Sequence, residues 1–303
     1  MSLHHTWKMF PDEDDRPAKP RLCGVTEIRG PQYSLLSTNY LQDVFESMED
    51  FIDGFTLSGG CHSLMPESYI KSIIAMAHQH GVYVTTGDWA EHMIRRGHSA
   101  FKRYLEDCKR VGFDTIELDA GSLRVSEDIL LRYIRLIKNR DLKAKLKLSI
   151  NFAKSEIPGL KPRAFGAYGV ASQPNDEIVE DENLMIMKAE RFVEAGADMV
   201  MINAEDVCKN IESVRGDVIA KMISRIGIEK IMFEAPSSKA TEWFIERYGP
   251  TVSTFDYLLF FFNGFIQGFD FQVNLFVDPS AVLPLECLRN GNMFASGSSY
   301  FTV

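Results

Sequence analysis

The chain has 303 residues, of which 45% are hydrophobic and 25% charged, with a net charge of −9 at pH 7. This is ordinary globular composition with enough length for a large core. The acidic balance, without a long Lys/Arg run, argues against nucleic acid and membrane surfaces as partners. The five cysteines are far apart and form no CxxC motif, which favours a reduced, cytoplasmic protein. The first 20 residues lack a signal-peptide core, and we expect a flexible arm there.

Eight short apolar runs predict β-strands, and segments with helical apolar spacing lie between them. The runs occupy residues 23–28, 53–57, 82–86, 114–118, 145–150, 198–202, 230–234 and 273–277. Eight strand–helix alternations predict an α/β fold, a (β/α)8 TIM barrel formed by a single domain over residues 21–303. A doubly wound open sheet is the alternative, but no G-x-G-x-x-G motif follows the first strand.

A Phe-rich segment, residues 253–272, interrupts this order just before the eighth predicted strand. It contains "TFDYLLFFFNGFIQGFDFQ", whose polar residues and glycines argue against a membrane span. Without it, the seventh helix and the eighth strand would be joined by a connection of ordinary length. We interpret the segment as an aberrant insert of the kind that a translated intron would produce. An authentic apolar helix covering the barrel bottom is the alternative.

Polar residues and glycines follow several of the predicted strands, where TIM barrels carry their functional sites. Glycines after the second strand would let a ligand approach backbone amides, although a tight turn would also explain them. The residues that we expect to contact a substrate here are Arg29, Ser58, Gly59, Gly60 and Lys239.

Acidic residues recur at the ends of the predicted strands. Glu117 and Asp119 are two residues apart and share one face of the fourth strand, and Glu234 ends the seventh. Carboxylates are the hard oxygen ligands that Mg²⁺ prefers. We therefore predict a magnesium site formed by these three residues; the alternative is that they satisfy neighbouring backbone groups.

Six sequence motifs carry a family resemblance: "GVTEIRG", "GVYVTTGDWAEHM", "GFDTIELDAGS", "AGADMVMINAEDVC", "IEKIMFEAP" and "LECLR". They occur in this order within residues 21–290 and resemble the phosphosulfolactate synthase family. "TGDWAEHM" and "EWFIERYGP" are similar to its heat-stress-associated 32-kDa branch in plants. The resemblance implies a (β/α)8 barrel. In the microbial enzymes it implies Mg²⁺-dependent addition of sulfite to phosphoenolpyruvate, which gives phosphosulfolactate.

The resemblance also assigns site residues. Lys154 matches a lysine proposed as catalytic, which would act as a proton donor, although a solvated loop lysine is the alternative. Glu117 and Glu234 match acidic strand ends with catalytic roles if the protein is active. Gly121 and Ser122 match positions expected to contact the substrate.

Four positions depart from the synthases. Thr56 stands where the synthases have a lysine, Ile150 and Asn203 stand where they have glutamates, and Glu205 stands at or near a phosphate-loop arginine. A carboxylate in place of a phosphate-facing cation repels the ligand. We therefore interpret the chain as a barrel protein that acts in acquired thermotolerance through protein partners, without the ancestral synthase activity. The alternative is an active Mg²⁺-dependent synthase, and a small anionic ligand and a homo-oligomer stay open.

Deleting residues 253–272 is expected to raise the yield of soluble protein, because exposed Phe-rich surface promotes aggregation. The yields of the parent and of the deletion variant would be compared after expression under the same conditions. A lower yield from the deletion variant would identify the segment as an authentic packed element.

Overall fold

A closed barrel of eight parallel strands forms the centre of the computed structural model, in the order β1 to β8. The structure describes residues 18–30, 37–119, 126–149, 182–203, 216–235, 237–248 and 272–289. The strands are β1 (Thr26–Arg29), β2 (Gly54–Thr56), β3 (Tyr83–Thr85), β4 (Thr115–Asp119), β5 (Lys143–Ser149), β6 (Met199–Asn203), β7 (Ile231–Glu234) and β8 (Asn274–Val277). Pairing of β1 with β8 closes the ring. The predicted TIM barrel is confirmed, and each predicted strand overlaps an observed one.

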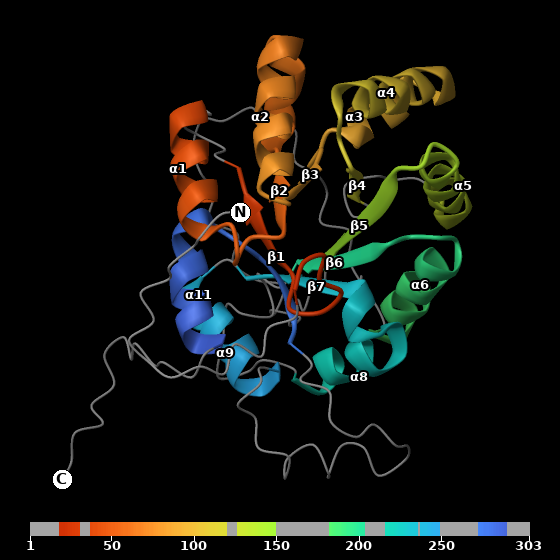
Figure 1. The fold of residues 1–303 in the computed structure, drawn as a ribbon. Helices are drawn as coiled ribbons and strands as arrows, with labels where there is room; N and C mark the ends of the chain where they lie inside the picture. The colour runs from red at the N-terminus through yellow and green to blue at the C-terminus, as the bar shows by residue number, and fades with distance from the viewer. Residues whose placement is uncertain are drawn as a thin grey trace, which may run out of the picture.

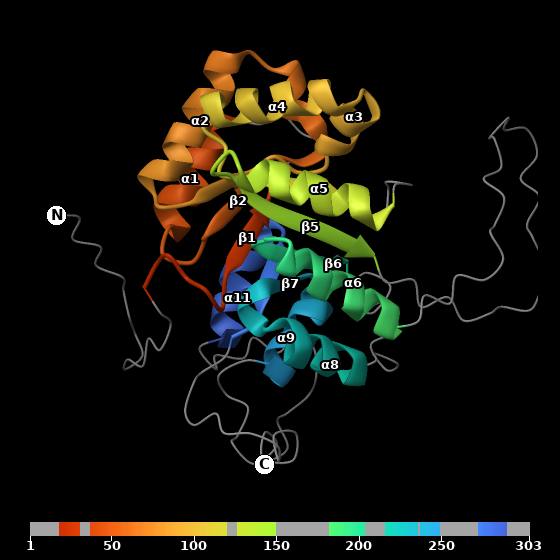
Figure 2. The ribbon, with the colours of Figure 1, turned by 90° about the vertical axis from the view of Figure 1, so that its right-hand side faces the viewer.

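Helices surround the barrel, as Figures 1 and 2 show. They are α1 (Thr38–Met48), η1 (Ser58–Leu64), α2 (Glu67–Gln79), α3 (Ala90–Arg95), α4 (His98–Val111), α5 (Glu127–Lys138), α6 (Glu182–Glu194), α8 (Gly216–Ile226), η3 (Ile228–Lys230), α9 (Ser238–Tyr248), η4 (Pro279–Ala281) and α11 (Val282–Arg289). Within the described ranges, no helix has both the length and the apolar character needed to cross a membrane.

Strand β5 shows how the sequence divides the two faces of the barrel wall. In "KAKLKLS", Ala144, Leu146 and Leu148 are buried in the large apolar cluster that the strands share with the helices. The lysines between them face the other way, into the barrel, because successive side chains of a strand alternate. The apolar cluster inside the barrel is small, and its buried members are Val25, Met201, Met232 and Phe276. Polar and charged groups complete the interior.

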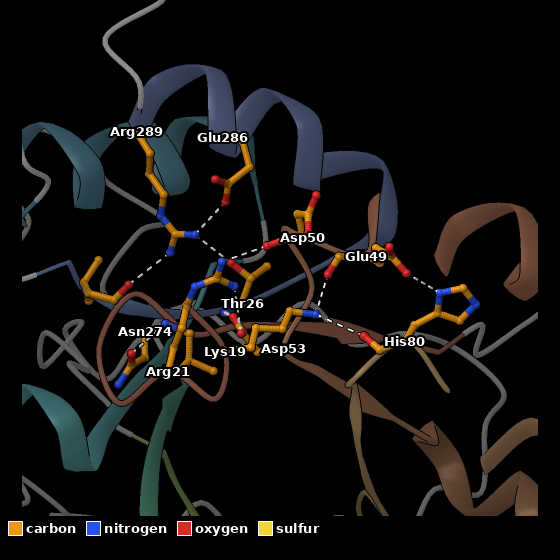
Figure 3. Close-up of polar contacts among 12 residues, drawn as sticks. Lys19, Arg21, Thr26, Glu49, Asp50, Asp53, His80, Asn274, Glu286 and Arg289 are labelled. Carbon is orange, nitrogen blue, oxygen red and sulfur yellow. Dashed lines mark hydrogen bonds and ion pairs between the residues drawn. The ribbon is translucent and has the colours of Figure 1, made fainter. Parts of the chain in front are cut away.

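The segment just before β1 is fastened across the end of the barrel where the strands begin (Figure 3). Lys19 donates to the backbone carbonyls of Glu49 and His80, the latter at 3.3 Å. Arg21 Nη1 lies 2.9 Å from Asp53 Oδ1, and the pair is almost completely buried. Asp53 Oδ2 also accepts a hydrogen bond from the amide of Thr26, at 2.8 Å. The start of the barrel is therefore tied to α1, β2 and α2.

The seam between the first and last strands is closed by buried polar groups (Figure 3). Arg289, at the end of α11, donates to Thr26 Oγ1 at 2.6 Å and to Glu286 Oε1 at 2.8 Å. Asn274 Oδ1 accepts from the amide of Val25 at 2.8 Å. These contacts join segments at opposite ends of the described chain.

The Phe-rich segment falls outside the described residues except for Gln272, so the insert stays a prediction. Gln272 is buried, and its carbonyl accepts a hydrogen bond from the amide of Gly24 at 2.7 Å.

Replacing Arg289 with Met is expected to lower the free energy of unfolding by about 3–5 kcal/mol, because it removes the buried cation that pairs with Glu286. Urea unfolding measures the loss. Replacing Glu286 with Leu in the same chain removes the buried carboxylate as well and should recover most of the loss. Arg225→Met, which breaks an exposed pair with Glu190, is the matched control and should cost less than about 1 kcal/mol. If Arg289→Met and Arg225→Met lose the same amount of stability, burial does not make the Arg289–Glu286 pair more important than the exposed one.

Candidate functional site

A buried carboxylate on β1 is the centre of the polar interior. Glu27 has no exposed surface, and donors from three other strands surround it. The Thr56 hydroxyl and Lys145 Nζ both donate to its Oε1, the lysine at 2.6 Å, and Tyr83 donates to its Oε2 at 2.8 Å. These side chains point inward because each follows the inward alternation of its own strand. Both oxygens of Glu27 are therefore satisfied by the barrel wall.

Lys145 joins Glu27 to a second carboxylate. Its Nζ lies 2.7 Å from Glu117 Oε2, and the two groups form an ion pair. Desolvation acts to lower the pKa of Lys145, but the nearby carboxylates of Glu117 and Glu27 outweigh it and raise the pKa. Burial raises the pKa of Glu117, and Lys145 opposes that shift only in part. Lys145 thus pairs with two buried acids and stays charged at neutral pH.

A second charged layer lies nearer the ends of the strands. Glu234, at the end of β7, pairs with Arg29 through Oε1 and with Lys147 through Oε2, the latter at 3.1 Å. The Arg29 guanidinium also stands 4.9 Å from the centre of the Phe276 ring. The side chains of Arg29 and Lys147 are 24% and 21% exposed, whereas that of Lys145 is 2% exposed. This layer is therefore the part of the described interior that solvent can reach.

Three of the predicted site residues come together in these two layers: Arg29, Glu117 and Glu234. Asp119, which ends β4, lies opposite Lys147 in the strand register, and its amide donates to Glu91 Oε1 at 2.5 Å. These acids have lysine and arginine partners in the structure, and their predicted roles in a site stay predictions.

The other predicted residues lie elsewhere or are not described. Ser58 and Gly59 begin η1, and Lys239 is exposed on α9. Gly60 packs beneath Trp89 at a φ of +65°, and a Cβ there would come within 2.0 Å of the Trp89 ring. Close packing with Trp89 therefore requires a glycine at this position. Gly121, Ser122 and Lys154 lie outside the described residues, and their roles stay predictions.

The predicted magnesium ligands do not fit a metal ion in this arrangement. Glu117 already pairs with Lys145, and Glu234 pairs with Arg29 and Lys147. Across the described ranges, no group of three or more His, Cys, Asp and Glu side chains is placed to hold a metal. Mg²⁺ takes oxygen ligands that are available to it, and a carboxylate held by one or two cations is a poor donor.

Lys145 and Lys147 are charged residues of the barrel interior that were not predicted from the sequence. The signal was present in "KAKLKLS", because lysines at every second position share one face of a strand. The outer face of a barrel strand must be apolar to pack on helices, so that shared face has to be the interior. Their carboxylate partners could not be assigned, since they come from three other strands.

Glu91, on α3, is a further buried acid beside this site. Its side chain is 5% exposed, and burial raises the pKa of the carboxyl from its ordinary value to about 7. Hydrogen bonds from the amides of Asp119 and of Glu91 itself oppose the shift, and the charges of Asp119 and Glu117 add to it. Glu91 therefore titrates in the neutral range.

Comparison with known proteins identifies the class of barrel. The family model described as (2R)-phospho-3-sulfolactate synthase (ComA) matches residues 14–254. The chain therefore belongs to the phosphosulfolactate synthase family, and the predicted family is confirmed.

Individual relatives divide into two groups. The chain is 54% identical to "Protein HEAT-STRESS-ASSOCIATED 32" of Arabidopsis thaliana, over 99% of both chains. It is 22% identical to a phosphosulfolactate synthase of Methanothermobacter thermautotrophicus, over 78% of this chain and 85% of that one. Identity to the Bacillus subtilis phosphosulfolactate synthase is 24%, over 78% and 86%. The predicted similarity to the heat-stress-associated branch is confirmed.

Raising the pH from 5 to 8 is expected to remove up to about 3 kcal/mol of stability through Glu91. Its pKa is about 7 in the folded protein against an ordinary 4.5, so its stabilising contribution is complete below pH 4.5 and is lost as the pH rises through 7. Urea unfolding at several pH values would show this loss in the parent.

Glu91→Gln is the informative variant, because it keeps the shape of the side chain and cannot ionise. Its stability should fall less between pH 5 and 8 than that of the parent. Glu106→Gln, which changes an exposed acid on α4, should follow the parent. If Glu91→Gln shows the same pH dependence as the parent, the carboxyl does not titrate in this range.

Proposed function

We propose that this protein acts in the heat-stress response, in acquired thermotolerance, as a member of the phosphosulfolactate synthase family without synthase activity. The observation that carries the proposal is the pairing of charges inside the barrel. Glu117 and Glu234 are paired with Lys145, Lys147 and Arg29, so in the described part of the chain these acids and cations satisfy one another.

Thr56 supports the loss of activity at one specific position. The family resemblance places a lysine there in the synthases, and here a buried hydroxyl donates to Glu27 instead. The charge that Glu27 needs comes from Lys145 on the opposite wall. Phosphoryl and enediolate groups require cations or preorganised donors, and Thr56 supplies neither, because its hydroxyl is committed to an internal acceptor.

The sequence identities to the two groups of relatives also support the proposed loss of synthase activity. The heat-stress-associated protein matches this chain at 54% identity over nearly its whole length, whereas the two synthases compared above match at 22% and 24%. Asn203, at the position where the resemblance expects a glutamate, lies opposite Glu234 in the strand register. The Asn203 difference from the synthases therefore lies beside Glu234, a residue that an active enzyme would use.

The alternative is an active Mg²⁺-dependent synthase with Lys154 as the proton donor. One observation favours it: Arg29 and Lys147 are partly exposed cations at the outer layer. They could bind a small anionic ligand if Glu234 moved away, and Lys154 would then have to reach the same space.

We place the protein in the cytoplasm, acting through protein partners, and a homo-oligomer is compatible with this role. The thiols of Cys23, Cys108 and Cys287 are all free, which suits a reducing compartment.

Purified full-length protein is expected to form no phosphosulfolactate above a protein-free blank when given phosphoenolpyruvate, sulfite and Mg²⁺. The Bacillus subtilis synthase, assayed in parallel, is the positive control. Product that appears with the parent chain and disappears with Lys154→Ala would establish the alternative instead.

The heat-stress role needs a separate assay, because absence of synthase activity does not demonstrate it. Expression of this chain in an Arabidopsis line lacking the heat-stress-associated relative should restore survival of a second heat treatment after acclimation. Failure to restore survival at a matched protein level would reject the role.

A further inference from the structure

Two helices on opposite sides of the barrel carry opposite charges on their outer sides. Helices α1 and α5 follow β1 and β5, which are four strands apart in the closed ring, and Figure 1 shows the two helices on opposite sides of the molecule. The exposed acids Asp43 and Glu46 lie on α1, and we call them the acidic face. The exposed cations Arg132 and Arg135 lie on α5, and we call them the basic face.

The acidic face belongs to a stretch of chain without any Lys or Arg. Residues 30–70 contain six acids and none of the 33 Lys and Arg residues of the protein. Asp43 and Glu46 project away from the buried side of α1, which is formed by Leu41, Val44, Phe45 and Met48. Glu46 accepts a hydrogen bond from the side-chain amide of Gln42 in the same helix, and neither acid pairs with a cation in the described ranges. The negative charge of α1 is therefore not compensated by its surroundings.

The basic face has the reverse composition. Residues 129–140 contain four cations and no acid. Two of these cations, Lys138 and Arg140, pair with acids of neighbouring segments. The other two, Arg132 and Arg135, project from the exposed side of α5 and pair with no side chain in the part of the chain that the structure describes.

The acids at the start of α5 are already paired. Glu127 and Asp128 lie 2.6 and 3.9 Å from the guanidinium group of Arg191 on α6. Asp128 is one turn before Arg132, and the contact with Arg191 compensates part of its charge. The outer side of α5 therefore keeps a positive charge.

The two faces match in spacing as well as in charge. Asp43 and Glu46 are the sixth and ninth residues of α1, and Arg132 and Arg135 are the sixth and ninth residues of α5. Residues three positions apart lie on the same side of a helix, about 4.5 Å apart along its axis. Two ion pairs can therefore form at once when α1 of one molecule packs beside α5 of another.

We propose that the acidic face of one copy of this chain binds the basic face of a second copy, with Asp43 and Glu46 paired to Arg132 and Arg135. The interface also covers part of Tyr40, a 46% exposed side chain one turn before Asp43. It is heterologous, because each copy contributes a different face, and every bound copy keeps one face free for a further copy. Exposed ion pairs contribute little individually, so the association is weak and reversible.

A second copy fits this arrangement better than an unrelated acidic protein does, because the chain itself carries both faces with the same spacing. The net charge of −9 opposes self-association. At about 0.1 M salt, however, repulsion between charges more than about 10 Å apart is largely screened, whereas the paired faces are in contact. The inference goes beyond the proposed function, and it depends neither on synthase activity nor on the heat-stress role.

Sedimentation velocity of the full chain at about 0.1 M salt, over a range of protein concentrations, measures this association. The parent is expected to form species larger than a dimer as its concentration rises. One double variant, Asp43→Asn with Glu46→Gln, removes the acidic face, and the other, Arg132→Gln with Arg135→Gln, removes the basic face. Each double variant alone should associate about tenfold more weakly than the parent, because two exposed ion pairs are lost. Salt at about 1 M should weaken the parent in the same direction.

Mixing the two double variants is the most informative measurement. Each variant keeps the face that the other lacks, so an equimolar mixture should form a dimer with the affinity of the parent and nothing larger. The proposal is wrong if the parent stays monomeric at every concentration or stops at a dimer. It is also wrong if the mixture associates no better than either variant alone.

Two control variants separate the faces from net charge. Glu194→Gln with Glu246→Gln changes exposed acids on α6 and α9, and Lys71→Gln with Lys221→Gln changes exposed cations on α2 and α8. Both controls should associate like the parent, and equal weakening in a control would reject the assignment of the faces. Circular dichroism and the Tm show whether every variant is folded, which is expected because all the changed side chains are exposed.

A different occupant of the basic face gives a distinct result. A peptide rich in Asp and Glu binds a monomeric parent in that case, and Arg132→Gln with Arg135→Gln abolishes the binding. This outcome would assign the basic face to a foreign acidic partner and reject self-association. Synthase and heat-survival assays play no part in these measurements, so failure of this inference is distinguishable from failure of the proposed function.

Discussion

The ion pairs of Lys145 with Glu27 and Glu117 are the interaction on which the barrel interior depends. Three charged side chains from β5, β1 and β4 meet where a TIM barrel usually has branched apolar residues. Burying them is costly unless they neutralise one another, and each needs the others to stay in place. The inward face of the sheet therefore cannot be altered one residue at a time. In the second layer, the single carboxylate of Glu234 is paired with two cations, Arg29 and Lys147.

This arrangement gives the acidic residues at the strand ends a structural explanation. In isolation, Glu117, Asp119 and Glu234 have the chemistry of a magnesium site. With Lys145 beside Glu117, and Lys147 and Arg29 beside Glu234, these two acids become counterions within the wall.

The sequence was sufficient for the fold because β-strand and α-helix periodicities were both clear and alternated eight times. It was also sufficient for the inward position of Glu117, since its neighbours Ile116 and Leu118 are apolar and face the helices. The contact of Lys145 with Glu27 could not be predicted from the sequence, because 118 positions separate the two residues and only closure of the barrel brings them together. The burial that shifts Glu91 was equally hidden, since α3 is short and its cover comes from β4.

The seam between β1 and β8 has a consequence for synthesis of the chain. Arg289 and Thr26 are 263 positions apart, and their contact helps to fasten the two strands that close the ring. During synthesis on the ribosome, β1 can pair only with β2. Its other edge stays unpaired until β8, in the last eighth of the polypeptide, has been made. Contacts of such long range form slowly and leave unpaired strand edges open in the meantime. A nascent molecule of this kind is a natural client for chaperones until the ring is complete.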